Sequence, residues 1–201
     1  MCWMLTAPDQ SNDGRKLGYL QDPQKWRHRD PPLFDFLQRC VTANERGVRL
    51  LEKANLLPGA VFFSEILGDN AVHRQVYFER ALAALRAADV LFFDPDTGIE
   101  VPSTPYGRRE SCRYLYWREV EKAASTDASF VIFQHWKREN RPNMLSRLSA
   151  ALRSSIGEAA VLAIDSPFVV FLTACRLRHR ERFMVALRLM RDRWTGDLEA
   201  K

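Results

Sequence analysis

The stretch Ala88-Asp-Val-Leu-Phe-Phe-Asp-Pro-Asp-Thr-Gly-Ile-Glu100 decides the predicted fold. Its apolar run, Val90 to Phe93, ends abruptly at two carboxylates, a proline and a glycine. A short apolar run bounded by turn residues is typical of a buried parallel strand. Ligands of open α/β sheets bind outside the carboxyl ends of the strands, so Asp94 and Asp96 stand where a functional site is expected.

Working outward from this stretch, the periodicity of apolar residues predicts alternating helices and strands. Helices are expected at 33–56, 71–88, 114–124, 142–154 and 180–194, and strands at 60–63, 90–93, 130–133, 161–164 and 169–174. Such alternation favours an α/β fold with a mostly parallel sheet flanked by helices on both faces, a Rossmann-like three-layer sandwich. The last two strands, joined across Asp165-Ser-Pro167, are expected to form a C-terminal antiparallel pair.

Length and composition indicate a globular protein of one domain, residues 1–201. Hydrophobic residues make up 46% of the chain and charged residues 27%, which is ordinary for a soluble protein. The longest apolar stretch is interrupted at Asp165, so no membrane span is predicted. Four scattered cysteines without a CxxC pair, and a start without a basic leader, favour a reducing cytoplasm.

Polar residues follow three of the predicted strands. Parallel strands lie about 4.8 Å apart, so groups at neighbouring strand ends can reach one ligand. Asp94, Pro95 and Asp96 are the catalytic candidates from the central strand end. The substrate-binding candidates are Glu65, Gln134, His135, Lys137 and Arg138.

Residues 60–176 resemble the C-terminal half of class I S-adenosylmethionine-dependent methyltransferases. In that family the fourth strand ends in an acidic, proline-containing motif, and Phe93-Asp94-Pro95-Asp96 stands in its place. The resemblance implies that Asp94 and Pro95 face the substrate and that S-adenosylmethionine is the cofactor. It also implies that the motif orients a target amine for in-line methyl transfer. The glycine-rich cofactor loop of the family is not found in the chain, and Asp96 makes the motif more acidic than the common one.

The same acidity supports a different chemistry. Glu65 with Asp94 and Asp96 is similar to a Toprim-type site, and Asp94, Asp96 and Glu100 to a simpler nuclease-like site. Clustered carboxylates suit Mg²⁺, which organises phosphate oxygens for phosphodiester chemistry. A third alternative is a Rossmann-like binding protein without catalysis.

The charge distribution makes nucleic acid the expected macromolecular partner. The net charge is +5 and the isoelectric point about 9.2. Residues 8–32 are polar and rich in turn residues, which predicts a long loop or lid that carries basic and aromatic side chains. The predicted C-terminal helix is rich in arginine, although such residues also form ordinary solvated helix faces.

Overall fold

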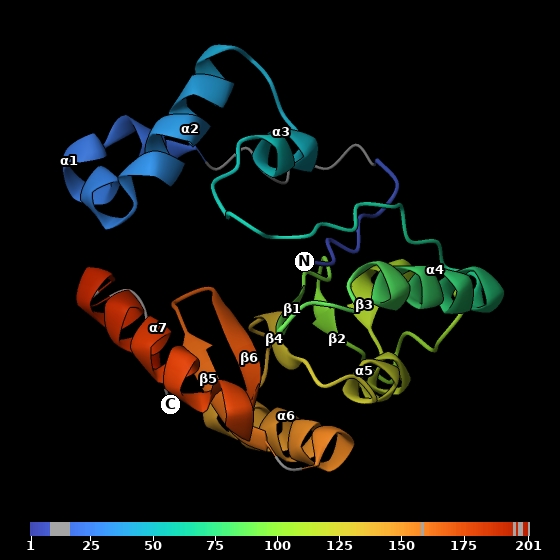
Figure 1. Cartoon of the computed structure of the whole chain (residues 1–201). Helices are drawn as coiled ribbons and strands as arrows, with labels where there is room; N and C mark the ends of the chain where they lie inside the picture. The colour runs from blue at the N-terminus through green and yellow to red at the C-terminus, as the bar shows by residue number, and fades with distance from the viewer. Residues whose placement is uncertain (9–16, 158, 195, 197–198, 201) are drawn as a thin grey trace. The chain divides into compact units, whose positions relative to one another are not determined.

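The computed structural model of the chain describes residues 1–8, 17–157, 159–194, 196 and 199–200 (Figure 1). We expected a single domain. The contacts between residues divide the chain into two compact units, Pro8–Ala60 and a larger one formed by Met1–Ala7 with Val61–Lys201. Each unit is described by itself.

The smaller unit is helical. Its elements are η1 (Gly18–Gln21), α1 (Pro23–Trp26), η2 (Arg27–Arg29), α2 (Pro31–Thr42) and α3 (Val48–Lys53). Residues 9–16 of the predicted loop 8–32 lie outside the described residues, and much of the remainder forms short helical turns. The reason lies in the Asp-Pro pairs: the Asp22 and Asp30 carboxylates accept hydrogen bonds from Lys25 N and Leu33 N at the helix starts. Proline at the first helical position is compatible with such caps.

The larger unit contains a five-stranded sheet of order β1-β4-β6-β5-β7. Its strands are β1 (Val90–Phe93), β4 (Ser129–His135), β5 (Ala159–Asp165), β6 (Val169–Arg176) and β7 (Glu199–Ala200). A second sheet pairs β2 (Gly98–Ile99) with β3 (Tyr114–Leu115) in parallel. The helices are α4 (Ala71–Ala84), α5 (Trp117–Ala124), α6 (Arg141–Ile156) and α7 (Arg180–Arg193), with short turns η3 (Ser111–Arg113) and η4 (Leu177–His179).

The prediction of a mostly parallel, Rossmann-like sheet is wrong. Within the main sheet β1 and β4 pair in parallel, whereas the pairs β4–β6, β5–β6 and β5–β7 are antiparallel. The predicted antiparallel pair is present as β5 and β6, because the short turn at 166–168 reverses the chain. Its second strand, β6, lies between β4 and β5 rather than at an edge, and this insertion makes the sheet mixed.

The first residues of the chain lie beside β1. Cys2 forms parallel bridges with Phe93 on one side and Phe63 on the other, and Leu5 bridges Ile66. Cys2 N donates to Phe92 O at 2.8 Å, and Asp94 N donates to Cys2 O at 3.0 Å. These bonds fix the position at which Asp94 leaves β1.

The hydrophobic core lies on one face of the main sheet. Alternate strand residues such as Phe93, Ile132 and Leu172 are buried there, together with side chains from α4, α5 and α6. The intervening residues Phe92 and Phe171 point to the other face, where they are half-buried and lie 6.2 Å apart between ring centroids. Successive side chains of a strand alternate between faces, so the burial pattern follows from the sequence.

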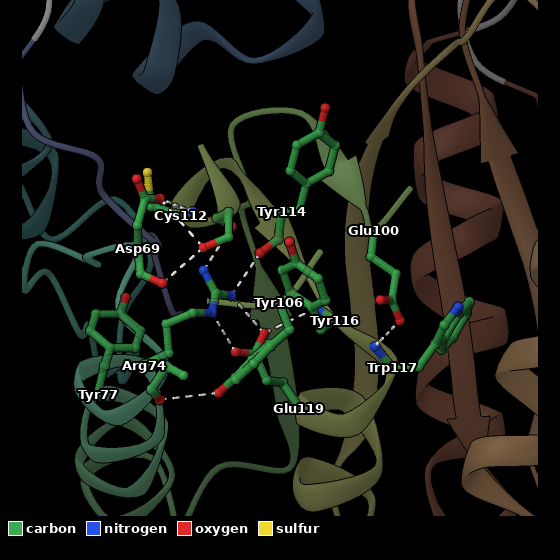
Figure 2. A network of polar contacts seen from close by, with 12 residues as sticks. Asp69, Arg74, Tyr77, Glu100, Tyr106, Cys112, Tyr114, Tyr116, Trp117 and Glu119 are labelled. Carbon is green, nitrogen blue, oxygen red and sulfur yellow. Dashed lines mark hydrogen bonds and ion pairs between the residues drawn. The ribbon is translucent and has the colours of Figure 1, made fainter. Parts of the chain in front are cut away.

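A buried ion pair joins α4 to α5 and to the segment before β3 (Figure 2). The Arg74 side chain is 0% exposed, and its Nε and Nη2 donate to the Glu119 carboxylate at 2.9 and 2.8 Å. Its remaining donors reach the carbonyl oxygens of Ser111 and Tyr114 at 2.7 and 2.9 Å. A guanidinium withdrawn from water requires such partners, so this pair fixes the segment 111–114 relative to α4.

No helix in the described part of the chain is both long enough and apolar enough to cross a membrane.

Replacement of Arg74 by methionine should destabilise the protein by roughly 3–5 kcal/mol, because the Glu119 carboxylate is then buried without its counter-ion. The double variant Arg74→Met/Glu119→Leu should recover a large part of that loss. Chemical denaturation followed by circular dichroism measures both. Arg109→Ala is the control, since the Arg109 side chain is 92% exposed. Additive losses in the double variant would contradict the coupling.

Candidate functional site

The candidate site is the turn 94–98, which connects β1 to β2. Besides the bond from Asp94 N to Cys2 O, Thr97 N donates to Arg113 O at 2.9 Å. The Arg113 guanidinium also forms an ion pair with the Asp96 carboxylate. Since Arg113 lies between the two carbonyl groups that Arg74 holds, the buried ion pair of the core positions the turn indirectly.

The glycine of the turn is required by a side chain of β4. Gly98 has φ +125°, and a Cβ atom at this position would lie 2.5 Å from the Gln134 amide group. Gln134 Oε1 accepts a hydrogen bond from Ile99 N at 2.7 Å, and its Nε2 donates to His135 O at 2.8 Å. The Gln134 amide is 0% exposed and therefore fixes β2 against β4 from the inside.

A cavity of about 290 Å³ opens beside the turn. The first residues of the chain form one wall, the turn forms another, and β4 contributes two rings. The lining residues are Trp3, Met4, Leu5, Thr6, Asp94, Pro95, Asp96, Phe133 and His135. The Phe133 and His135 rings meet edge to face at 4.9 Å. Aromatic walls around a carboxylate suit a flat ligand that carries hydrogen-bond donors.

Asp94 is the chemically distinctive group of this cavity. Burial raises the pKa of Asp94 to about 6, and the negative charge of Asp96 adds to the rise. Among the residues that the structure describes, no side chain or backbone N–H donates a hydrogen bond to the Asp94 carboxylate. A desolvated carboxylate without a donor, in a cavity, is typical of a functional acid or base.

The predicted substrate-binding residues do not all meet at this cavity. His135 lines it. Gln134 is buried beneath the turn, and Lys137 Nζ donates to Ile99 O at 3.0 Å. Burial lowers the pKa of the Lys137 ammonium group. Arg138 is exposed in the segment after β4. Glu65 does not line the cavity, and its carboxylate forms an ion pair with Arg80, with 2.6 Å between Oε1 and Nη2.

Three of the four carboxylates proposed for a metal site have other partners. Asp96 pairs with Arg113 and Glu65 with Arg80. Glu100 Oε1 accepts the hydrogen bond of Trp117 N at the start of α5 (Figure 2). Across the described ranges, no group of three or more His, Cys, Asp or Glu side chains is placed to hold a metal ion.

A larger cavity, of about 430 Å³, adjoins the buried Arg74 side chain. Its charged groups are mostly neutralised, since Arg74 pairs with Glu119 and Lys122 with Glu79 at 2.9 Å. We favour the smaller cavity as the candidate site because it contains a carboxylate that no described residue neutralises.

Sequence reasoning did not find the cavity residues Trp3, Met4, Leu5, Thr6 and Phe133. The apolar run 2–5 was a signal for a short strand, but nothing local indicated that it lies beside β1, where Cys2 bridges Phe93. Phe133 occupies an ordinary strand position, and only the pairing of β1 with β4 brings it beside the turn.

Comparison of the chain with protein-family models, curated proteins and solved structures finds no significant match.

Gly98→Ala should destabilise the protein by roughly 1–3 kcal/mol, because the backbone is in a conformation that only glycine adopts without strain. The contact with Gln134 adds to this cost, so the loss should be smaller in a Gln134→Ala background. Thermal unfolding of the four proteins measures the difference. Gly68→Ala, where the nearest atom to a new Cβ is 4.0 Å away, is the control. An equal cost in both backgrounds would argue against the proposed contact.

Proposed function

We propose that the Asp94 cavity is the acceptor site of a group-transfer enzyme that modifies a nitrogen atom of a flat substrate. The group transferred is a methyl group in this proposal, and the substrate is a base of a nucleic acid. The observation that carries the proposal is the Asp94 carboxylate, which lies half-buried in an aromatic-walled cavity with no donor from the described residues.

The chemistry assigned to Asp94 follows from its protonation. A carboxylate with a pKa of about 6 is ionised at neutral pH and accepts protons more readily than an ordinary aspartate. It accepts a hydrogen bond from the N–H of the target group and orients the nitrogen lone pair away from itself. As the nitrogen forms its new bond to carbon, it loses this proton to the Asp94 carboxylate. Trp3, Phe133 and His135 hold the plane of the base.

Pro95 and Asp96 have supporting roles in this proposal. Pro95 is buried and fixes the backbone φ angle between the two aspartates. Asp96 is held by Arg113, so its charge is partly neutralised and the turn is kept in one conformation. Asp96 therefore positions the turn, whereas Asp94 contacts the substrate.

The proposed cofactor, S-adenosylmethionine, supplies an electrophilic methyl group and leaves as a neutral thioether. A cavity of about 290 Å³ has room for the base and none for a second ligand. The described lining residues therefore bind the base in this proposal, and the cofactor is not assigned to them.

Asp94→Asn should reduce the rate of methyl transfer by about 10²-fold or more, because the proton acceptor is lost. The assay follows radiolabelled methyl from S-adenosylmethionine into mixed-sequence RNA and single-stranded DNA. Glu65→Gln is the matched control: the magnesium alternative requires Glu65, and the methyl-transfer proposal does not. Absence of transfer by the wild-type protein, together with no thermal stabilisation by S-adenosylmethionine, would refute the proposal.

Asp94→Asn should also raise the stability of the protein near neutral pH. The folded-state pKa lies above the ordinary aspartate value of 3.8, so the folded state binds the proton more tightly. The resulting stability is fully present below about pH 4 and is lost as the pH rises through about 6. The variant, which cannot ionise, should gain up to about 3 kcal/mol over wild type across this range. Thermal unfolding at several pH values tests this, and a difference independent of pH would contradict it.

A further inference from the structure

The turn between β5 and β6 carries an exposed aromatic residue, Phe168, at the same end of the sheet as the Asp94 cavity. The Phe168 side chain is 80% exposed, the highest value among the large apolar residues described as exposed. The turn lies at the carboxyl end of β4, because Val169 pairs with His135. β4 lies between β6 and β1, so the axes of β6 and β1, the strand that ends at Asp94, are about 10 Å apart.

The exposed ring is carried on a rigid support. Trp136 Nε1 donates to Ser166 O at 2.8 Å, and Arg141 Nη2 donates to Pro167 O at 2.7 Å. The Ser166 hydroxyl is also bonded to Val169 O at 3.0 Å. These bonds hold the turn in one conformation, so Phe168 is presented to solvent with little backbone entropy left to lose on binding.

A positive charge lies beside this turn, since Arg141 bonds to Pro167 O. The Arg141 guanidinium lies over the Trp136 ring, 4.7 Å from its centroid. Arg138 is exposed in the segment after β4, and no carboxylate in the described chain forms an ion pair with it. A large exposed ring near arginines and a second aromatic ring is the combination by which proteins hold unpaired bases and their phosphates.

We infer that this edge binds single-stranded nucleic acid, with one base stacked on Phe168 and the phosphates held by Arg138 and Arg141. The inference rests on the proposed function and specifies its substrate class: the strand runs along the edge, and a neighbouring base enters the Asp94 cavity. Paired bases have no free face for Phe168, so a duplex binds more weakly.

The test is fluorescence anisotropy of the full chain with a labelled oligonucleotide of about 15 nucleotides, as single-stranded DNA, as RNA of the same sequence and as a duplex. Phe168→Ala should weaken single-strand binding roughly five- to a hundredfold, and Phe168→Trp should preserve it. Leu177→Ala is the matched control. Leu177 is 64% exposed and follows β6 at its opposite end, about 30 Å from Phe168. Arg138→Ala should reduce the dependence of binding on salt.

Equal binding by Phe168→Ala and wild type, or equal affinity for duplex and single strand, would overturn the inference. So would a loss of self-association in Phe168→Ala, measured by analytical ultracentrifugation, because Phe168 would then be part of an interface between copies. Binding needs no methyl donor, so the inference and the proposed function fail separately.

Discussion

The buried Arg74–Glu119 ion pair is the interaction on which the geometry of the site depends. A fully buried guanidinium must find acceptors for its donors, and Arg74 finds them in Glu119 and in the carbonyl groups of Ser111 and Tyr114. Those carbonyl groups lie on either side of Arg113, whose own carbonyl and guanidinium hold Thr97 and Asp96. The position of the turn is therefore determined by a charge in the core, and a shift of α4 would be transmitted to it through backbone hydrogen bonds.

On its opposite side, the turn is held by hydrogen bonds of the uncharged Gln134 amide. Gly98 allows the Gln134 amide to approach where any Cβ atom would collide with it, and that amide satisfies the N–H of Ile99. Arg113 acts from the segment before β3 and Gln134 from β4, so the turn is fixed from two independent elements. This arrangement explains why the turn can hold a carboxylate in an unfavourable environment.

Local sequence patterns predicted the strand ends and turns, because these depend on residues that are neighbours in the chain. The apolar run 90–93 and the carboxylates after it gave the end of β1 and the place of the candidate site, and the Asp165-Ser-Pro167 break gave the β5–β6 reversal. The insertion of β6 beside β4 depends on pairing between segments distant in sequence, so the mixed sheet was missed. The Asp-Pro pairs near residues 22 and 30 were interpreted as loop signals, although the same pairs cap helices. Gln134 was expected to bind substrate, and its actual partners follow from the close approach of β2.

Two aspartates separated by one proline have opposite environments. Asp96 is neutralised by Arg113 and stabilises the turn, whereas Asp94 is partly desolvated, lies next to another carboxylate and has no donor among the described residues. If the motif served only as a turn, the Asp94 charge would be a net cost to stability that an asparagine would avoid while keeping the turn geometry. An unfavourable charge held in place by an otherwise well-satisfied network is expected where the group acts on a ligand. This contrast between neighbours is the argument for Asp94 as the reacting group and Asp96 as its support.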